Sequence, residues 1–591
     1  MKILGISGLE KAAHFKRTHW PGLDDREYRM IQGMDSAAVL VVNGKLVAAA
    51  EQERFCGKKH TGDFPIDAIR YCLSHAGVSI FEIDEIAHGF DFAPHRDHFT
   101  PDELSTGIFD KVFSRNILLS QVRRDLPGYS VANVHNVSNQ LAQAASAAYT
   151  SGWDECLIVV NQAMGEVESL SVYSFQDGKF NKIHGLAISD SIGLLCSLVT
   201  LHLGFEFNSD EYKIMGLAPY GDPARFRGFF EGAVQLRPGG FIRIPMLHGN
   251  CEERENYTAT RAWLGQRLLP ARAPDEPIQS IHQDVAAAMQ ERVERAVLHV
   301  CEHFGRKTGM RRLALAGNIS LNCTAHGKLS RSTAFDEIYV QPLSAGDGAA
   351  LGSALYRTSL AMEIPNKRFP VPLFGPRYNA REIETVLHRC NRKLQFKRYN
   401  SLEETCAAAA QSIAEGHVIA WSRGRMEFGP CALGNRSILA DPGRPEMRER
   451  VNIAMKRSEA TLEKNGTFCP FASACAIEEA HRWFDIAPGA EFPYKTSTVE
   501  VRPEMRSLLP AITHLDGSTR LQTVSVDGNS DFHALLVAIG ETTGRQMALN
   551  TSFDAKGQPI VNGPEEAIEA FLNSGIEDLF LENFHVCRNG A

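Results

Sequence analysis

The chain of 591 residues has no long apolar run, and no uninterrupted stretch approaches the length of a membrane span. Its first residues, MKILGI, are typical of a β-strand and lack the long apolar core of a secretory signal peptide. We therefore expect a cytoplasmic protein without a membrane partner.

The sequence also lacks a cysteine framework and an excess of basic charge. Its 13 cysteines are odd in number, scattered and never spaced Cys-x-x-Cys, which indicates buried free thiols and argues against a zinc site made of cysteines. The net charge of −8 argues against a nucleic-acid-binding surface over the whole molecule, so no nucleic-acid partner is expected.

The hydrophobic content of 44% is ordinary for a globular protein, but the length is too great for one core. Four prolines fall within residues 364–378, which indicates a linker. We expect an N-terminal domain over residues 1–362, a proline-rich linker over 363–379 and a second α/β domain over 380–591.

Hydrophobic periodicity predicts an α/β fold. Residues 36–50 read as two β-runs around Asn43 and Gly44, and residues 155–175 repeat this strand-turn-strand pattern. Helices are expected at residues 67–75, 141–149, 279–304 and 345–356. A hairpin unit that occurs twice, with helices between, fits the duplicated sheets of the actin, hsp70 and sugar-kinase superfamily.

Residues 423–442, RGRMEFGPCALGNRSILADP, combine arginines with three closely spaced glycines and a proline. Glycines allow backbone N–H groups to approach a ligand, and guanidinium groups donate in pairs to phosphate or carboxylate oxygens. This pattern favours an anion-binding site over a solvated surface loop.

The same block resembles GRMEFGPRALGNRSILADP of the O-carbamoyltransferases of antibiotic tailoring and nodulation-factor synthesis. The resemblance covers nearly the whole chain and includes EYKIMGLAPYGDP at 211–223, LNCTAHGKL at 321–329 and ALNTSFDAKGQPIV at 548–561. It implies an actin-like (ASKHA) N-terminal domain, similar to the tRNA threonylcarbamoyl transferase subunit, and a YrdC-like C-terminal domain.

In that family the YrdC-like domain uses carbamoyl phosphate and ATP to make carbamoyl adenylate. The larger domain then passes the carbamoyl group to a substrate hydroxyl at an iron site. The resemblance therefore implies ATP as the cofactor and a small molecule as the acceptor.

The transfer site departs from the family pattern. The two metal-binding histidines of HHLAHAASAFY correspond to Asn139 and Gln143, and the family's VDGVGE appears as VNQAMGE with Asn161 in place of aspartate. Met34 replaces the histidine of HDSAA, although Asp35 remains. Carboxamides are weak ligands, so we predict no metal ligands and expect no iron-dependent transfer of the usual kind. The candidate catalytic residues are Asn139, Gln143, Asn161 and Asp35.

The resemblance also carries over a set of residues for the nucleotide cleft of the larger domain. Any one of them equally suits a tight turn or a helix cap, but together they favour a surviving cleft. The set comprises Glu211, Lys213, Gly216, Gly317, Asn318, Asn322 and Asp347.

At the adenylation site, the chain retains the family cations Arg425, Arg436 and Lys456, together with the polar Asn550 and Ser552. These five residues are predicted to bind nucleotide or donor phosphate.

Three other arginines of the family pattern are missing from the adenylation site. Their places are taken by Cys431, Ser458 and Cys469, and residues 460–467 form an insertion. Loss of one buried charge partner costs about 2–5 kcal/mol, so the three losses argue against tight binding of carbamoyl phosphate. Two small thiols that fill the space of arginines are preferred over a catalytic cysteine pair.

A second insertion, residues 14–30, carries four basic residues and Trp20. An extended surface loop is the favoured interpretation, and a substrate-specific segment is the alternative.

Three functions remain open from the sequence. The chain is expected to be a diverged enzyme that transfers a carbamoyl or related acyl group from an ATP-activated donor to a secondary metabolite. The alternatives are a catalytically silent partner of an active paralogue and a metal-free enzyme with a different donor. A paralogous subunit and a homodimer are both open as assembly states.

Overall fold

The computed structural model describes residues 1–99, 103–250, 256–365, 367–390, 393–454 and 471–589. The chain divides into two compact units. The first comprises Met1–Glu276 and Ser280–Phe369, and the second comprises Pro277–Gln279 and Pro370–Ala591. The division between 369 and 370 falls inside the proline-rich segment.

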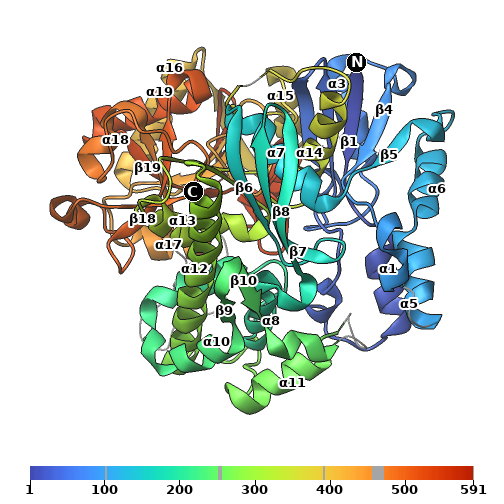
Figure 1. The fold of residues 1–591 in the computed structure, drawn as a ribbon. Coiled ribbons are helices and arrows are strands. Elements are labelled where there is room, and N and C mark those ends of the chain that lie inside the picture. The colour runs from blue at the N-terminus through green and yellow to red at the C-terminus, as the bar shows by residue number, and fades with distance from the viewer. Residues whose placement is uncertain (100–102, 251–255, 366, 391–392, 455–470, 590–591) are drawn as a thin grey trace. The chain divides into compact units, whose positions relative to one another are not determined.

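The first unit contains two five-stranded sheets that share one topology (Figure 1). In each sheet the central strand has an antiparallel hairpin on one side, whose nearer strand pairs antiparallel with it, and two parallel strands on the other side. The orders are β3-β2-β1-β4-β5 and β8-β7-β6-β11-β12. This repeat confirms the duplicated actin-like fold. The strands are β1 (Lys2–Ile6), β2 (Ala37–Val42), β3 (Lys45–Glu51), β4 (Glu85–His88), β5 (Val134–Asn136), β6 (Glu155–Asn161), β7 (Glu168–Gln176), β8 (Lys179–Ala187), β11 (Arg312–Ala316) and β12 (Glu337–Val340).

Helices α7 (Asn139–Ser151) and α14 (Gly346–Ser359) pack against each other between the two sheets (Figure 1). Helix α14 contacts β1, β2 and β4, whereas α7 contacts β6 and β11. The two backbones approach closely because the contact is made by small residues: a Cβ on Gly352 would lie 1.7 Å from the carbonyl oxygen of Ala142. As a result, Gln143 in the first turns of α7 donates from Nε2 to the Ala345 carbonyl at the start of α14, at 2.7 Å.

All four helices predicted from periodicity are present, as α3, α7, α12 and α14. A small antiparallel pair, β9 (Gln235–Arg237) and β10 (Phe241–Arg243), completes the strands of this unit. The remaining helices are α1 (Lys11–His19), α2 (Glu53–Cys56), α3 (Ile66–Ala76), α4 (Arg96–Phe99), α5 (Glu103–Ile108), α6 (Arg115–Asp125), α8 (Ile192–His202), α9 (Glu211–Leu217), α10 (Arg227–Ala233), α11 (Thr258–Arg267), α12 (Ser280–Thr308) and α13 (Cys323–Ser330).

The second unit is built on one mixed nine-stranded sheet with the order β13-β21-β20-β14-β15-β19-β16-β18-β17. Its strands are β13 (Leu394–Arg398), β14 (Ile419–Ser422), β15 (Arg436–Ala440), β16 (Ala472–Ala476), β17 (Thr498–Glu500), β18 (Ser518–Val524), β19 (Met547–Ser552), β20 (Asp578–Leu581) and β21 (Phe584–Arg588). Its helices are α15 (Ala380–Arg389), α16 (Leu402–Glu415), α17 (Met447–Ala454), α18 (Ile477–Trp483), α19 (Val526–Thr543) and α20 (Pro564–Leu572). The likeness of this unit to YrdC stays a prediction.

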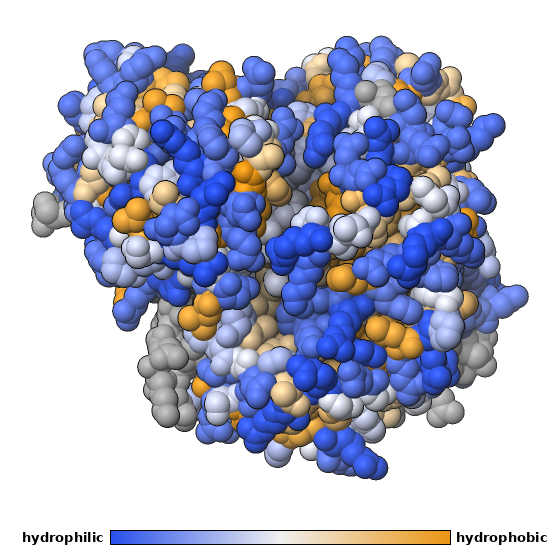
Figure 2. Space-filling model, turned by 60° about the vertical axis from the view of Figure 1, so that its left-hand side comes forward, coloured by the Kyte–Doolittle hydropathy of each residue, from blue (hydrophilic) through white to orange (hydrophobic). Residues whose placement is uncertain are grey.

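Near-continuous apolar runs such as AAVLVV in β2 and LIVV in β6 are buried, as expected for strands that are covered on both faces. Figure 2 shows hydrophilic residues over most of the face in view, with apolar residues in small separate patches. Among the described residues, no helix has the length and apolarity needed to cross a membrane.

We predict that Gly352→Ala will destabilise the protein by about 2 kcal/mol or more, because the new methyl group would overlap the Ala142 carbonyl and force α7 and α14 apart. Urea unfolding followed by circular dichroism measures this change. The matched control is Gly228→Ala in α10, where a Cβ meets no atom within 4 Å. It should be neutral or stabilise by about 0.5–1 kcal/mol. Equal effects of the two substitutions would contradict the close contact.

Candidate functional site

The first turn of α7 holds a buried polar cluster in which Asn139 is fully engaged. The backbone N–H of Asn139 donates to Glu166 Oε1 at 2.6 Å, and the N–H of Asp91 donates to the same oxygen at 2.9 Å. The Asn139 side chain donates to the Gly89 carbonyl at 3.0 Å and accepts from Gln162 Nε2. The residue that replaces a family histidine therefore belongs to an amide network.

Glu166 is only 3% exposed, and only one of its carboxylate oxygens is held by these bonds. Burial raises the pKa of Glu166 to about 7, although backbone hydrogen bonds, including those from Asp91 and Asn139, oppose the rise. Its second oxygen, Oε2, has no hydrogen-bond partner among the described residues. A carboxyl group of this pKa can exchange a proton near neutral pH, and sequence comparison did not single it out.

The second replaced position, Gln143, lies beside Asp347. Gln143 Oε1 is buried and accepts no hydrogen bond within the part of the chain that the structure describes. Asp347 Oδ1 accepts from the N–H groups of Ala345 at 2.8 Å and Gly348 at 2.7 Å. Burial, with the nearby Glu51 charge, raises the pKa of Asp347 to about 8. The bonds fit the helix-end interpretation of Asp347, and its nucleotide contact stays a prediction.

Asp35 belongs to a second cluster at the start of α14. It adopts a left-handed backbone conformation (φ 62°), and its carboxylate pairs with His60 Nδ1 at 2.6 Å. Burial raises the pKa of Asp35, but the charge and hydrogen bond of His60 outweigh burial, so the net pKa is lowered. Glu53 Oε2 accepts from the N–H of His60 at 2.6 Å, and these three side chains form a donor set that could hold a divalent cation. Sequence comparison missed His60.

The end of β6 lies against the Gly317-Asn318 turn. A Cβ on Gly317 would lie 2.4 Å from the Asn161 carbonyl oxygen, and φ there is +87°. Asn318 Oδ1 accepts from the N–H of Ala163 at 3.1 Å. Three predicted residues, Asn161, Gly317 and Asn318, are therefore brought together, near the Gln162–Asn139 pair.

Glu211 and Lys213 of α9 form a group that lies next to the Asp35 cluster. Glu211 Oε1 accepts from Ser197 Oγ at 2.5 Å and from the Asn208 N–H at 2.8 Å, and Lys213 pairs with Asp210 at 2.8 Å. Burial raises the pKa of Glu211. Ser209, next along the chain from Asn208, contacts His60 Nε2 at 3.3 Å, which joins this group to the Asp35 cluster.

Of the two remaining predicted nucleotide residues, one belongs to α9 as well and the other lies elsewhere. Gly216 is buried within α9. Asn322 caps α13 by accepting from the Ala325 N–H at 3.1 Å, and it exchanges two side-chain hydrogen bonds with Gln290 of α12. These bonds account for Asn322 structurally, and its role in nucleotide binding stays a prediction.

In the second unit, Arg436 is buried among backbone carbonyls. Its guanidinium donates to the carbonyls of Asn435 at 2.8 Å, Asn562 at 3.1 Å and Gly424 at 3.2 Å. Burial lowers the pKa of Arg436. Arg425 donates to the carbonyl of Gly375 at 3.2 Å. Both predicted phosphate ligands therefore bind the loops that surround the RGRMEFGP block, and a phosphate contact stays a prediction.

Two cations that sequence comparison missed lie beside Cys431. Arg520 Nη2 lies 3.3 Å from Cys431 Sγ. Lys495 is 4% exposed, and its ammonium group donates to the carbonyls of Ala432 at 2.6 Å and Asn550 at 3.3 Å. Burial lowers the pKa of Lys495 to about 7. A guanidinium from β18 and an amine from the loop before β17 thus stand next to the cysteine that replaces an arginine.

Asn550 lies in the same row of the sheet as Arg520, since both are paired with Ala472 of β16. Its amide donates to Gln522 Oε1 at 3.0 Å. Ser552 donates to Asp554 at 2.6 Å. Lys456, Ser458, Cys469 and the insertion 460–467 lie outside the described residues.

The expectation of a surface loop at residues 14–30 is wrong. Most of its first half forms α1, and the exposed fractions of Phe15, Lys16, Tyr28 and Met30 are 6%, 1%, 8% and 1%. The Lys16 ammonium donates to the Met30 carbonyl at 2.9 Å. The charge of the segment suggested solvation, but Phe15, Tyr28 and Met30 pack inward while His14, Arg17 and His19 are exposed.

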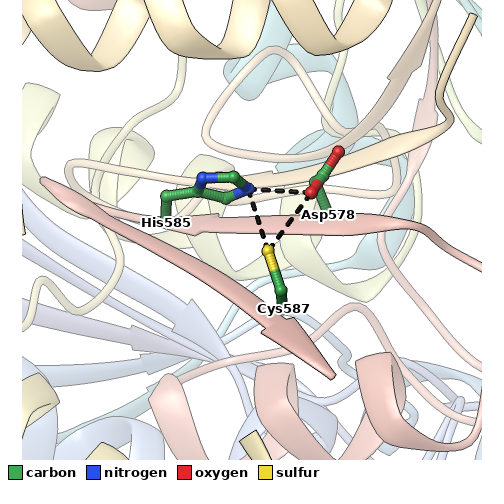
Figure 3. Close-up of side chains that lie close together, drawn as sticks. All are labelled: Asp578, His585 and Cys587. Carbon is green, nitrogen blue, oxygen red and sulfur yellow. Dashed lines mark hydrogen bonds and ion pairs between the residues drawn. The ribbon is translucent and has the colours of Figure 1, made fainter. Parts of the chain in front are cut away.

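A further polar cluster lies at β20 and β21 of the second unit. Figure 3 shows Asp578, His585 and Cys587 converging, with His585 Nε2 at 2.8 Å from Asp578 Oδ1 and at 3.3 Å from Cys587 Sγ. The second oxygen of Asp578 pairs with His417 Nδ1 at 2.7 Å. Oxygen, nitrogen and sulfur donors of this kind are ligands that metals bind.

Together these features define an α/β protein with a duplicated actin-like half and polar clusters at the ends of the two helices between its sheets. The chain belongs to the carbamoyltransferase family: the family models "Carbamoyltransferase N-terminus" and "Carbamoyltransferase C-terminus" match residues 31–355 and 410–588.

Curated relatives agree with this assignment. The nodulation protein NolNO of Sinorhizobium fredii is 35% identical over 94% of this chain and 79% of its own length. The 3'-hydroxymethylcephem-O-carbamoyltransferase of Amycolatopsis lactamdurans is 27% identical over 63% of this chain and 64% of its own. These relatives lend no support to the silent-partner or altered-donor alternatives.

A solved ROK hexokinase from Thermus thermophilus matches 60% of this chain and 98% of its own, at 14% identity and a TM-score of 0.27. The actin-like assignment rests on the strand order rather than on this low score.

We predict that the stability of the protein depends on pH through Glu166. Because its folded pKa of about 7 exceeds the ordinary value of 4.5, protonation of Glu166 stabilises the fold at pH 4.5 and below, and this contribution is lost as pH rises to 7. Glu166→Gln should therefore gain about 3 kcal/mol relative to wild type between pH 4.5 and pH 8 in urea unfolding. The control, Glu155→Gln at an exposed position, should follow wild type. A constant difference between Glu166→Gln and wild type would contradict the buried, protonated carboxyl group.

Proposed function

We propose that this protein activates a carbamoyl group, or a closely related acyl group, with ATP and transfers it to a small secondary-metabolite acceptor. The observation that carries the proposal is the placement of Arg520 and Lys495 beside Cys431. The absent arginine argued against binding of an anionic donor. A guanidinium 3.3 Å from the replacing sulfur supplies the missing charge from another strand.

The activation step belongs to the second unit in this proposal. Carbamoyl phosphate and water give carbamate and inorganic phosphate. A carbamate oxygen then attacks the α-phosphorus of ATP, the bond to the β-phosphate bridge breaks, and pyrophosphate leaves. Arg520 binds the transferred anion, and Lys495, with its pKa of about 7, takes up a proton when a phosphate arrives. Asn550 and Ser552 stay candidates for contacts with the nucleotide.

The transfer step belongs to the cluster at α7. The acceptor oxygen attacks the carbamoyl carbon, the bond from that carbon to the adenylate oxygen breaks, and AMP leaves. The acceptor proton passes to Glu166 Oε2, which is the free oxygen of a carboxyl group with a pKa near neutrality. Asn139 and Gln162 hold this carboxylate in place through the first turn of α7.

Iron does not fit the donors that this chain offers at the family position. Asn139 already uses its amide in two hydrogen bonds, and Gln143 offers a neutral carboxamide oxygen. Two neutral carboxamides and a single carboxylate are a poor set for Fe(II). No step of the proposed reaction therefore runs through iron.

We predict carbamoyl-phosphate-dependent exchange of pyrophosphate into ATP by the purified chain. Arg520→Gln should lower the exchange rate at least tenfold, because the donor anion loses its cation, whereas Arg520→Lys should retain more of it. Arg381→Gln, an exposed change in α15 of the same unit, is the control. Absence of exchange with carbamoyl phosphate and with a panel of short carboxylates would refute activation by ATP.

A further inference from the structure

A cavity of about 170 Å³ lies in the first unit, with Glu166 in its wall. Most of the wall is apolar and much of it aromatic, with side chains from α1, from the region of α4 and α5, and from the start of α8. The apolar wall includes Phe15, Trp20, Phe99, Val112, Phe113 and Leu194. A cavity of about 150 Å³ admits a molecule the size of benzene, so this one holds a substituted ring.

The polar atoms in the cavity wall differ in whether they already have a hydrogen-bond partner. Glu166 Oε2 and Gln32 Oε1 are acceptors that receive no hydrogen bond from the described residues, and Gln32 Oε1 is buried. The buried ammonium group of Lys16 is bonded to the Met30 carbonyl. An occupant therefore satisfies this cavity by bringing a small number of hydrogen-bond donors.

We infer that the cavity is the acceptor site and that the acceptor is an apolar, ring-bearing alcohol or amine rather than a sugar. The inference rests on the proposed function and narrows its substrate class. Aromatic walls favour a flat apolar body, and the two orphaned acceptors match a single hydroxyl or amino group. A sugar would bury several hydroxyls without partners, at about 1–3 kcal/mol for each one.

The segment 14–30 determines this specificity. It supplies Phe15, Lys16, Trp20 and Met30 to the wall, and it is an insertion relative to the family pattern. The Phe15 ring stacks on His19 with a centroid distance of 3.7 Å, which fixes the aromatic wall in α1. The carbamoyl donor can stay the same while this insertion changes the class of acceptor.

The test uses 2-naphthalenemethanol, a fluorescent apolar alcohol, and N-acetylglucosamine as the polar comparison. Titrated into the full chain without ATP or donor, the naphthyl alcohol should bind at 1:1 stoichiometry with at least tenfold higher affinity than the sugar. Val112→Trp fills the cavity and should weaken this binding at least tenfold. Ala12→Leu is a smaller filling change that should weaken it less. Leu104→Trp, on an exposed part of α5, is the matched control and should bind as wild type does.

The outcomes separate this inference from the proposed function. Binding of the alcohol that Val112→Trp removes supports the cavity even if no transfer from carbamoyl phosphate and ATP is found, in which case the proposed reaction fails alone. The inference is overturned if the chain prefers the sugar, or if the folded Val112→Trp and Ala12→Leu variants bind the naphthyl alcohol as tightly as wild type does. Neither result would affect the proposed activation of the donor, which pyrophosphate exchange tests separately.

A second inference concerns the side-chain cluster on β20 and β21 of the second unit, and it is independent of the cavity. The ligand atoms Asp578 Oδ1, His585 Nε2 and Cys587 Sγ form a triangle with sides of 2.8, 3.3 and 3.5 Å. Around a tetrahedral Zn²⁺ with Zn–N and Zn–O of about 2.0–2.1 Å and Zn–S of about 2.3 Å, such sides measure roughly 3.3–3.6 Å. The three side chains thus approach one face of a zinc tetrahedron (Figure 3).

The strands explain this arrangement. His585 and Cys587 are two residues apart on β21 and share one face, and Asp578 lies on the paired strand β20. Phe580 stacks on the His585 ring at 4.6 Å and orients it, and His417 holds the outer oxygen of Asp578 at 2.7 Å. His585 Nε2 and Cys587 Sγ both lie within hydrogen-bond distance of Asp578 Oδ1, and a metal ion that replaces their protons would bind all three atoms at once.

We propose that Asp578, His585 and Cys587 bind Zn²⁺. Cobalt titration of the chelator-treated full chain should give one equivalent with a thiolate-to-cobalt absorption band, and zinc should displace it. Cys587→Ser should abolish that band and His585→Ala should weaken binding at least tenfold, whereas the control Cys390→Ser should leave both unchanged. A titration without a thiolate band, or one that is the same in Cys587→Ser, contradicts the site.

Discussion

The close contact between α7 and α14 is the constraint on which the first unit depends. Gly352 lets the backbone of α14 approach the Ala142 carbonyl, and the two sheets then pack on the outer sides of this helix pair. Because both helices are fixed at one spacing, the residues in their first turns meet without long side chains. Gln143 reaches the start of α14, and Asn139 holds Glu166. The polar centre is a consequence of helix packing more than of any single ligand.

Much of the fold could be predicted from the sequence. The hairpin around Asn43 and Gly44 and its repeat at 155–175 predict the duplicated sheets, since period-two apolar runs and turn residues are local signals. The long helix α12 was predicted within a few residues of its observed ends. The insertion 14–30 could not be placed, because its charges are visible in the sequence and the inward direction of Phe15 is not.

The candidate site could be predicted only where a motif marked it. Substitution at Cys431 was plain in the sequence, but the position of Arg520 beside it was not, because the two residues lie 89 positions apart and meet only when the second unit folds. His60 was missed because a single histidine outside a motif carries no signal. Glu166 ends the VNQAMGE motif, but the motif does not show that this glutamate is buried or that its pKa is raised.

Arg436 shows that a motif residue can be retained for a structural reason, even where the reaction associated with the motif has changed. Its guanidinium ties the loops at Gly424, Asn435 and Asn562 to one another, and so the arginine stabilises these loops whatever the second unit binds. Selection for a folded chain alone preserves such a residue. Members of one family can therefore differ in acceptor, metal or donor and still share RGRMEFGP. The presence of this block shows common ancestry, but it does not by itself show which reaction a protein catalyses.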